Sequence, residues 1–113
     1  MDSYVDVILP LPIRNTFTYF FEKKTFLNIS VGMRVVVPFG KKRIFTGIIS
    51  KIHSHKPSNY EVKSIIILLD KKPMIRESSF VFWKWVSQYY MCNIGEIMKA
   101  SLPSTLLLEG ENQ

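Results

Sequence analysis

The spacing of apolar residues changes once along this chain, and that change limits the folds open to it. Before Pro73, apolar and polar side chains alternate in short runs, which is typical of strands with one buried face. After Glu77, apolar residues recur every three or four positions, which indicates an amphipathic helix. Strands followed by helices predict an α+β domain.

Five short runs predict the strands. In the second run, Phe17, Tyr19 and Phe21 share one face, and this favours a place in the core. Gly47 falls in the middle of the fourth run, where glycine often marks a bulge or a sharp bend. Five curled antiparallel strands in about seventy residues predict a small OB-like or SH3-like barrel. The predicted strands cover residues 4–9, 16–22, 34–38, 44–52 and 60–69.

The helical part begins near residue 77. A serine, Ser78 or Ser79, is expected to cap the first helix. A second, short helix is predicted over residues 95–100, before Pro103. Helical spacing favours a core position over nucleotide stacking for the aromatic residues of the first helix. The apolar stripe consists of Phe82, Trp85, Val86, Tyr89 and Tyr90, and the aromatic candidates are Trp83, Trp85, Tyr89 and Tyr90.

Length and charge narrow the class of protein. The chain has 113 residues and a net charge of +6, and 47% of its residues are hydrophobic. We expect one folded domain over residues 1–113, with strands at about 3–70 and helices at about 77–101. A compact basic domain attracts polyanions, of which nucleic acid is the commonest. An anionic membrane surface or an acidic protein would also suit this charge.

Sites of catalysis and metal binding are not indicated. The sequence contains no phosphate-binding glycine motif, and its two histidines, His53 and His55, lie in a polar loop where surface positions are expected. Cys92 is the single cysteine, and we expect a buried, inert thiol in a reducing cytoplasm. No signal peptide is visible, and the longest apolar run, residues 65–69, is too short to cross a bilayer. The segment is therefore predicted to have no catalytic residues, metal or cofactor.

Three places could bind nucleic acid. Residues 14–19 combine aromatic and small polar side chains, which can stack on a base, although the alternation favours core for Phe17 and Tyr19. Residues 38–43, in which Gly40 is followed by three cations, could bind phosphate or form an ordinary solvated turn. Lys63 is placed either at a sheet edge or toward a ligand.

Four ordered blocks resemble the N-terminal, 3′-end-binding domain of the primosomal protein N′ family of replication-restart helicases. The resemblance covers nearly the whole chain. The blocks are VILPLP at 7–12 with TFTY at 16–19, GMRVVVPFGK at 32–41 with GII at 47–49, VKSI at 62–65 with LD at 69–70 and Pro73, and YY at 89–90 with Gly95 and ASLP at 100–103.

The resemblance implies a domain that captures the 3′-hydroxyl end of the nascent leading strand at stalled forks, with little base specificity. Its pocket would consist of Phe17, Thr18, Tyr19, Gly40 and Lys63. Backbone contacts from Lys41, Lys42 and Arg43 would support it. Many members of that family have an aspartate at the position that Thr18 occupies in this chain. A hydroxyl can donate as well as accept a hydrogen bond, unlike an ionised carboxylate.

The resemblance also places the protein in the bacterial cytoplasm, at the nucleoid. An ATP-driven 3′-to-5′ helicase core and a zinc-binding insert belong to the rest of a full-length family member, so ATP and zinc are expected there and not in this segment. We expect the natural chain to continue past Gln113. Single-stranded-DNA-binding protein and other primosome proteins are potential partners of the full-length chain.

Two other functions fit the residues. An SH3-like protein-interaction module could dock a peptide of a primosome protein or of a single-stranded-DNA-binding protein on its aromatic face. A stand-alone RNA-binding OB domain would instead prefer RNA through the 2′-hydroxyl.

Overall fold

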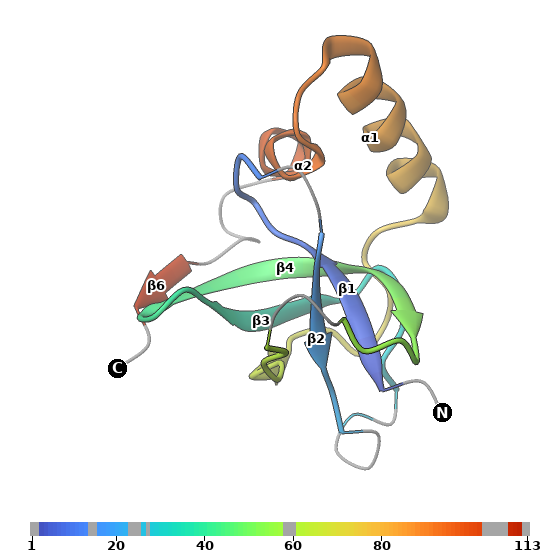
Figure 1. Ribbon diagram of the computed structural model, residues 1–113. Coiled ribbons are helices and arrows are strands. Elements are labelled where there is room, and N and C mark those ends of the chain that lie inside the picture. The colour runs from blue at the N-terminus through green and yellow to red at the C-terminus, as the bar shows by residue number, and fades with distance from the viewer. Residues whose placement is uncertain are drawn as a thin grey trace.

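The structure is a computed structural model that describes residues 3–13, 16–22, 26, 28–57, 61–102 and 109–111. Strands come first and two helices follow, as predicted, so the α+β fold class is confirmed (Figure 1). A last short strand, which the apolar pattern did not predict, follows the helices. In chain order the elements are β1 (Tyr4–Ile8), β2 (Phe17–Phe20), β3 (Arg34–Phe39), β4 (Arg43–His53), β5 (Ile67–Leu68), α1 (Glu77–Tyr90), α2 (Ile94–Ser101) and β6 (Glu109–Glu111).

The sheet has the strand order β2-β1-β4-β3-β5, with antiparallel neighbours, and β6 pairs with β4. The segment before β5 joins the two ends of this order. Ser64 bridges to Phe20 of β2, and three residues later Ile67 pairs with Val36 of β3. This segment thereby closes the sheet toward a small OB-like barrel.

The fifth strand is shorter than predicted for the same reason. Residues 60–69 were expected to form one strand, but regular pairing is confined to Ile67–Leu68 because the segment changes partners from β2 to β3. Tyr60, where that prediction began, lies outside the described residues.

Strands β1 and β4 cross closely, and a glycine permits it. A Cβ atom on Gly47 would collide with the side chain of Val7 and lie 2.8 Å from the carbonyl oxygen of Ile8. The register of this pair shifts between Asp6 and Val7, so a bulge lies near the glycine, as the sequence suggested. Any larger residue at position 47 would push the two strands apart.

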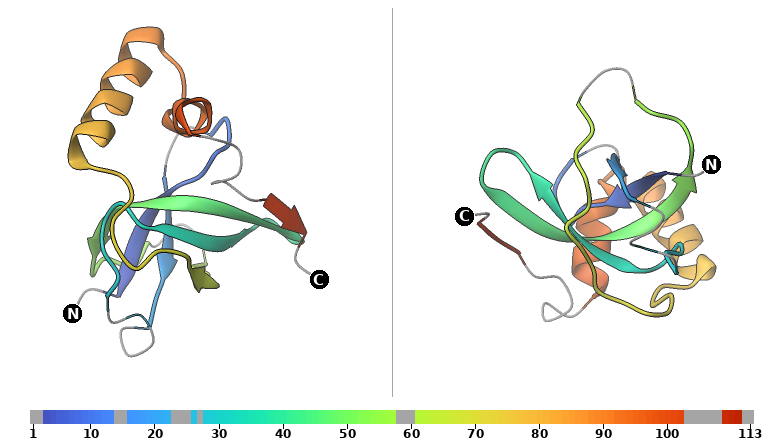
Figure 2. Two further views of the ribbon diagram at one scale, coloured as in Figure 1. Left: turned by 180° about the vertical axis from the view of Figure 1, so that it is seen from behind. Right: turned by 90° about the horizontal axis from the view of Figure 1, so that it is seen from below.

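Two apolar cores lie on opposite faces of the same strands. Alternation sends Val7 and Ile49 into the barrel and leaves Ile8 and Ile48 on the outer face. The outer pair is nevertheless buried, because α1 and α2 lie together over that side of the sheet (Figure 2). The inner core contains Val5, Val7, Leu9, Tyr19, Phe21, Met33, Val35, Val37, Phe45, Ile49 and Ile65, and the outer core contains Ile8, Ile48, Ile75, Trp83 and Met98.

Helix α1 spans the predicted residues but presents a different face to the core. Trp83 is 4% exposed, whereas Trp85, Tyr89 and Tyr90 are 55%, 67% and 68% exposed. The prediction that these three aromatics are core residues is wrong. The helix rests on the sheet through Phe80 and Trp83, one turn apart, so the stripe next to them faces outward.

The start of α1 also differs from the prediction. Arg76, with an extended backbone, precedes the first helical residue, and no side chain caps the helix there. Ser78 and Ser79 therefore lie inside the first turn and are not the N-cap. The helices found in the described residues have 14 and 8 residues, and none is long and apolar enough to cross a membrane.

Cys92 is exposed, so the prediction of a buried thiol is wrong. The helix ends at Tyr90, and Met91 takes the left-handed conformation with φ of 55°. Met91 itself is 92% exposed. The chain thus turns outward just where the apolar helix pattern suggested continued burial.

Candidate nucleic-acid interface

All five residues predicted to bind a 3′ end line one small pocket. They come from β2, from the turn after β3 and from the segment before β5, which the closure of the barrel brings side by side. The pocket has a volume of about 170 Å³. Its described lining consists of Phe17, Thr18, Tyr19, Pro38, Phe39, Gly40, Glu61 and Lys63.

Two hydrogen bonds fasten the end of β3 and the turn after it onto the other two segments. The hydroxyl of Tyr19 donates to the carbonyl oxygen of Pro38 over 2.8 Å, and Nζ of Lys63 donates to the carbonyl oxygen of Gly40 over 2.9 Å. The rings of Phe17 and Phe39 meet edge to face, 5.1 Å apart between centroids. The pocket therefore has aromatic walls whose separation is set by bonds to the turn.

Gly40 leaves one side of the pocket open. Its φ of 75° lies in the left-handed region that favours glycine, and no atom lies within 4 Å of where a Cβ would stand. A ligand could approach the backbone closely at this point, which is the role that the sequence suggested for a glycine here.

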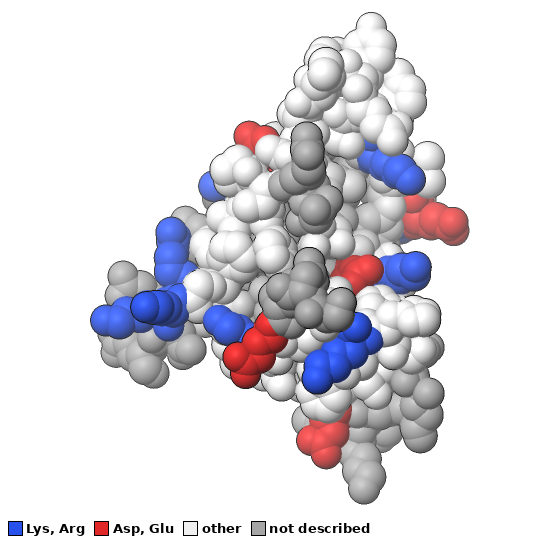
Figure 3. All heavy atoms as spheres, in the orientation of Figure 1, with Lys and Arg blue, Asp and Glu red and all other residues white. Residues whose placement is uncertain are grey.

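The cations that follow Gly40 form the tip of the β3–β4 hairpin. Lys41, Lys42 and Arg43 are all exposed, and basic side chains gather over this tip (Figure 3). The guanidinium of Arg43 lies 4.8 Å from the centre of the Phe45 ring. None of the three cations lines the pocket. They lie beside the pocket, where their positive charge could act on a nucleic-acid strand that extends out of it.

Thr18 is tied to a polar network on the outer face of the sheet. Its hydroxyl donates to Oδ1 of Asp6 over 2.7 Å, and Nε2 of His53 lies 2.8 Å from the same oxygen. The backbone N–H of His55 donates to Nδ1 of His53, so the neutral ring carries its proton on Nε2 and donates to Asp6. Within the described part of the chain, no group of three or more His, Cys, Asp or Glu side chains is arranged to hold a metal ion.

The position of His53 corrects an expectation. This residue ends β4, its side chain is only 12% exposed, and it has a carboxylate partner, whereas the sequence suggested a loop surface without one. The pairing of Tyr4 with His53 in the register of β1 and β4 explains the change, because it brings Asp6 near the same end of β4.

An ion pair anchors the segment that carries Lys63 to β3. The guanidinium of Arg34 contacts Asp70 at 2.8 Å, and the backbone N–H of Arg34 donates to the same carboxylate at 2.9 Å. Burial raises the pKa of Asp70, but the hydrogen bonds and charge of Arg34 outweigh it and hold that pKa below its ordinary value. The hydrogen bond that Arg34 donates to Asp70 raises the pKa of Arg34, against a smaller effect of burial.

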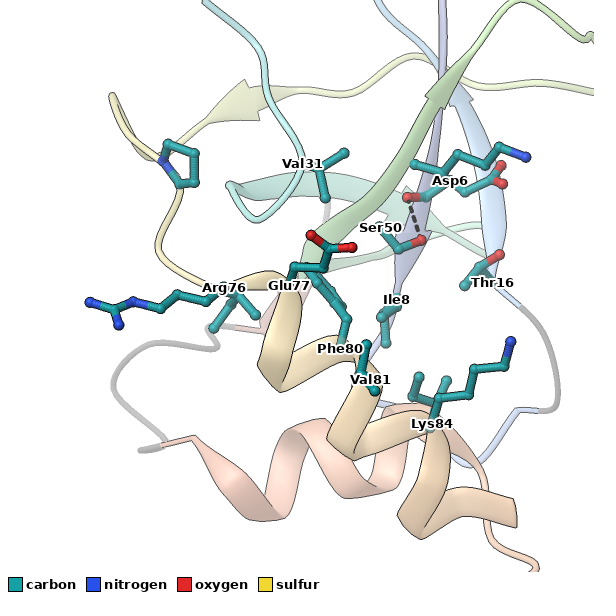
Figure 4. A pocket seen from close by; sticks show the side chains of 14 residues that line it. Asp6, Ile8, Thr16, Val31, Ser50, Arg76, Glu77, Phe80, Val81 and Lys84 are labelled. Carbon is teal, nitrogen blue, oxygen red and sulfur yellow. Dashed lines mark hydrogen bonds between the residues drawn. The ribbon is translucent and has the colours of Figure 1, made fainter.

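A second, larger hollow lies between α1 and the sheet, with a volume of about 930 Å³ (Figure 4). Phe80, Val81 and Lys84 of α1 face Ile8 and Thr16 across it. Its lining mixes apolar residues with charges of both signs, including Asp6, Lys51, Arg76 and Glu77. Thr16, from the candidate segment 14–19, lines this hollow, whereas the five residues predicted to form the 3′-end pocket do not.

Glu61 lines the small pocket but was missed by sequence reasoning, whereas Pro38 and Phe39 belong to a candidate segment and were left out of the predicted pocket. Pro38 and Phe39 precede Gly40 in the block already singled out. Glu61 stands two residues before Lys63, and alternate residues of an extended segment face the same side. That two-residue spacing was the available signal. Which side of the extended segment faces a pocket depends on the strand with which it pairs, and the sequence alone does not show that strand.

Comparison with known proteins identifies the family. Residues 6–103 match the family described as the PriA 3′ DNA-binding domain (3′BD). Proteins named "Replication restart protein PriA" are similar to the chain: those of Buchnera aphidicola (subsp. Schizaphis graminum) with 34% identity, Treponema pallidum with 26% and Haemophilus influenzae with 30%. These matches cover 90%, 92% and 90% of this chain but only 14%, 16% and 14% of the respective relatives.

The fold is that of a small OB-like domain in a chain of net charge +6, and the matching family is a class of DNA-binding domains. The chain belongs to the family of 3′ DNA-binding domains of the replication restart protein PriA. It spans about a seventh of the length of the curated relatives it matches.

Proposed function

We propose that this chain captures the 3′-hydroxyl end of a nascent DNA strand at a stalled fork, with little base specificity. The supporting observation is that Phe17, Thr18, Tyr19, Gly40 and Lys63, which come from three separate segments, line a single pocket. In this proposal the terminal nucleotide enters between the aromatic walls, and base stacking contributes roughly 1–3 kcal/mol. Lys63 provides positive charge near the end of the strand.

The pocket is small enough that only part of the terminal nucleotide, such as its base or its sugar, would enter it. Its volume of about 170 Å³ is below the roughly 300 Å³ at which pockets for drug-sized ligands begin. A longer stretch of DNA would have to run outside it, along exposed cations such as Lys41 and Lys42 of the hairpin tip. Contacts of that kind to phosphate position a strand without reading its sequence.

The proposal of little base specificity is supported by how two polar groups of the pocket are used. The hydroxyl of Tyr19 donates to the carbonyl oxygen of Pro38 in β3, and the ammonium of Lys63 donates to that of Gly40 in the turn after β3. A base is read by donors and acceptors that point at its edge. Polar groups already engaged with the protein are poorly placed for such reading, whereas aromatic faces accept any base.

The rest of the proposal concerns the full-length protein. We infer that the remainder carries an ATP-driven 3′-to-5′ helicase and a zinc-binding insert, so that this segment needs neither ATP nor zinc. The end-binding domain would then deliver the fork to the helicase, in the bacterial cytoplasm at the nucleoid. Supporting this, the matched relatives are replication restart proteins about seven times longer than the chain.

Fluorescence anisotropy with two single strands of identical sequence tests the proposal. One strand ends in a 3′-hydroxyl and the other in a 3′-phosphate. Tighter binding of the hydroxyl end supports end capture. Equal binding would leave a general single-strand binder, and no binding at low salt would reject DNA as the ligand of this segment.

A second candidate function, the docking of a partner peptide, is favoured by the exposed aromatics of α1. The rings of Phe82 and Trp85 stack with centroids 6.5 Å apart, and those of Trp85 and Tyr89 stack at 5.1 Å. An acidic peptide of a single-stranded-DNA-binding protein or a primosome protein would suit this surface and the net charge of +6. Titration of such a peptide without DNA, followed by tryptophan fluorescence, tests it: an unchanged signal would reject this candidate.

A further inference from the structure

An acidic residue, Glu61, lines the small pocket and lies two positions before Lys63 in the chain. Among the described residues that line it, Glu61 alone has a negative charge. Asp6, the nearest other acid to β2, does not line the pocket, and its carboxylate accepts hydrogen bonds from Thr18 and His53 on the outer face of the sheet. Any selection by negative charge inside the pocket therefore falls to Glu61.

The backbone next to Glu61 is fixed beside β2. The N–H of Phe20 donates to the carbonyl oxygen of Lys63 over 2.9 Å, and the N–H of Ile65 donates to the carbonyl oxygen of Phe20 over 3.0 Å. Glu61 and Lys63 are alternate residues and line the same pocket, as expected of an extended segment. The ammonium of Lys63 is held at the Gly40 carbonyl, so the pocket presents one positive and one negative group.

The negative charge of Glu61 distinguishes a 3′-hydroxyl end from a 3′-phosphate end. An ionised carboxylate only accepts hydrogen bonds, and a 3′-hydroxyl has one hydrogen to donate. A 3′-phosphate carries roughly −1.5 to −2 charge at neutral pH and has no such donor. A strand that continues past this nucleotide also places a charged phosphate at the same position. The carboxylate thus favours a terminal hydroxyl and disfavours both alternatives.

We propose that Glu61 is the specificity-determining residue that makes this pocket select a 3′-hydroxyl end over a 3′-phosphate end. This inference rests on the proposed function, because it assumes that the pocket holds the terminal nucleotide. Repulsion between two unit charges about 4 Å apart in water changes an equilibrium roughly fivefold, and a lower local dielectric increases the factor. The hydroxyl preference of the natural chain is therefore expected to be about fivefold or more.

The test measures the ratio of the two dissociation constants, phosphate end over hydroxyl end, for each variant of the 113-residue chain. Glu61→Gln keeps the size and the acceptor oxygen but removes the charge, so the ratio falls toward one. Glu61→Lys attracts the phosphate, so the ratio drops below one. Because Glu61 is exposed, both variants are expected to have the same melting temperature as the natural chain.

Glu77→Gln is the matched control, because Glu77 is exposed at the start of α1 and does not line the small pocket. It changes the net charge equally, so affinity for both strands rises together and the ratio stays at its natural value.

The outcomes separate the two proposals. A natural chain that binds both ends equally overturns end capture and this inference with it. A natural chain that prefers the hydroxyl end, with the same ratio in both Glu61 variants, overturns only the role of Glu61. A ratio that falls in the Glu61 variants and holds in Glu77→Gln supports the assignment.

Discussion

Nζ of Lys63 lies 2.9 Å from the carbonyl oxygen of Gly40 and donates a hydrogen bond to it. This contact joins the segment before β5 to the turn after β3 across 23 residues of sequence. The same ammonium lines the small pocket, so it both shapes the pocket and charges it. Its loss should affect ligand binding more than folding, because Lys63 is exposed.

Lys63→Ala is predicted to weaken binding of a 3′-hydroxyl strand about tenfold, the equivalent of roughly 1.4 kcal/mol, since a hydrogen bond to a charged group contributes about that much. Anisotropy titration gives the affinity and a melting curve checks the fold. Lys72→Ala, which removes an exposed lysine outside the pocket, is the control. Equal loss in both variants would mean that Lys63 contributes only general charge.

Tyr19 needs a gentler substitution, because its side chain is 4% exposed and belongs to the inner core. Tyr19→Phe removes the hydroxyl that donates to Pro38, and is predicted to reduce the free energy of unfolding by about 1 kcal/mol. Tyr19→Ala should reduce it by about 3–5 kcal/mol, as large core truncations do. Urea unfolding measures both. A Tyr19→Phe variant that is stable but binds 3′ ends poorly would show that the turn must be held in place for binding.

How far the sequence predicts the fold can be seen from the strands. Alternation placed Tyr19 and Phe21 in the core, and both are buried. The same rule failed for residues 60–69, because a strand pattern does not say that a segment will leave one partner for another. The pairing of Ser64 with Phe20 is a property of barrel closure, which depends on residues forty positions apart.

The pocket shows the same limit. Its five predicted residues came from a family resemblance, and the structure places them together. Glu61 was missed because a charged residue between a polar loop and an apolar run looks like an ordinary surface position. Helical periodicity similarly could not tell the face of Trp83 from that of Trp85, since both flanks of α1 are apolar and only packing against Ile8 and Ile48 decides between them.

Reversing the charge of the hairpin tip, Lys41→Glu with Lys42→Glu, is predicted to weaken binding of all DNA ends alike. Both lysines are exposed and outside the pocket, so their contacts would be to phosphates. The slope of log affinity against log salt should fall in magnitude by about 1.4 or more, at roughly 0.7 per contact on single strands. Lys71→Glu with Lys72→Glu is the matched control. A loss confined to hydroxyl ends would place the hairpin lysines inside the end-binding site.

The ion pair of Arg34 and Asp70 predicts a pH dependence of stability. The folded-state pKa of Asp70 is lowered, so its contribution is complete well above the ordinary value of 3.8 and is lost as the pH falls through the lower folded value. Asp70→Asn should reduce the free energy of unfolding by about 1–3 kcal/mol at neutral pH, because the side chains are 19% and 13% exposed. The difference from the natural chain should shrink in acid. A constant difference down to pH 2 would mean that the pair contributes through shape and not through charge.

The last prediction compares the two tryptophans of α1, which lie two residues apart in the helix but differ in burial. Trp83 is 4% exposed in the outer core, so Trp83→Ala should reduce the free energy of unfolding by about 3–5 kcal/mol. Trp85 is 55% exposed, so Trp85→Ala should change it by no more than about 0.5 kcal/mol. Urea unfolding followed by circular dichroism compares them without relying on tryptophan emission. Equal losses of stability in the two variants would mean that α1 packs through the stripe that contains Trp85, as its periodicity suggested. The aromatic residues of that stripe would then be buried and could not form a docking site.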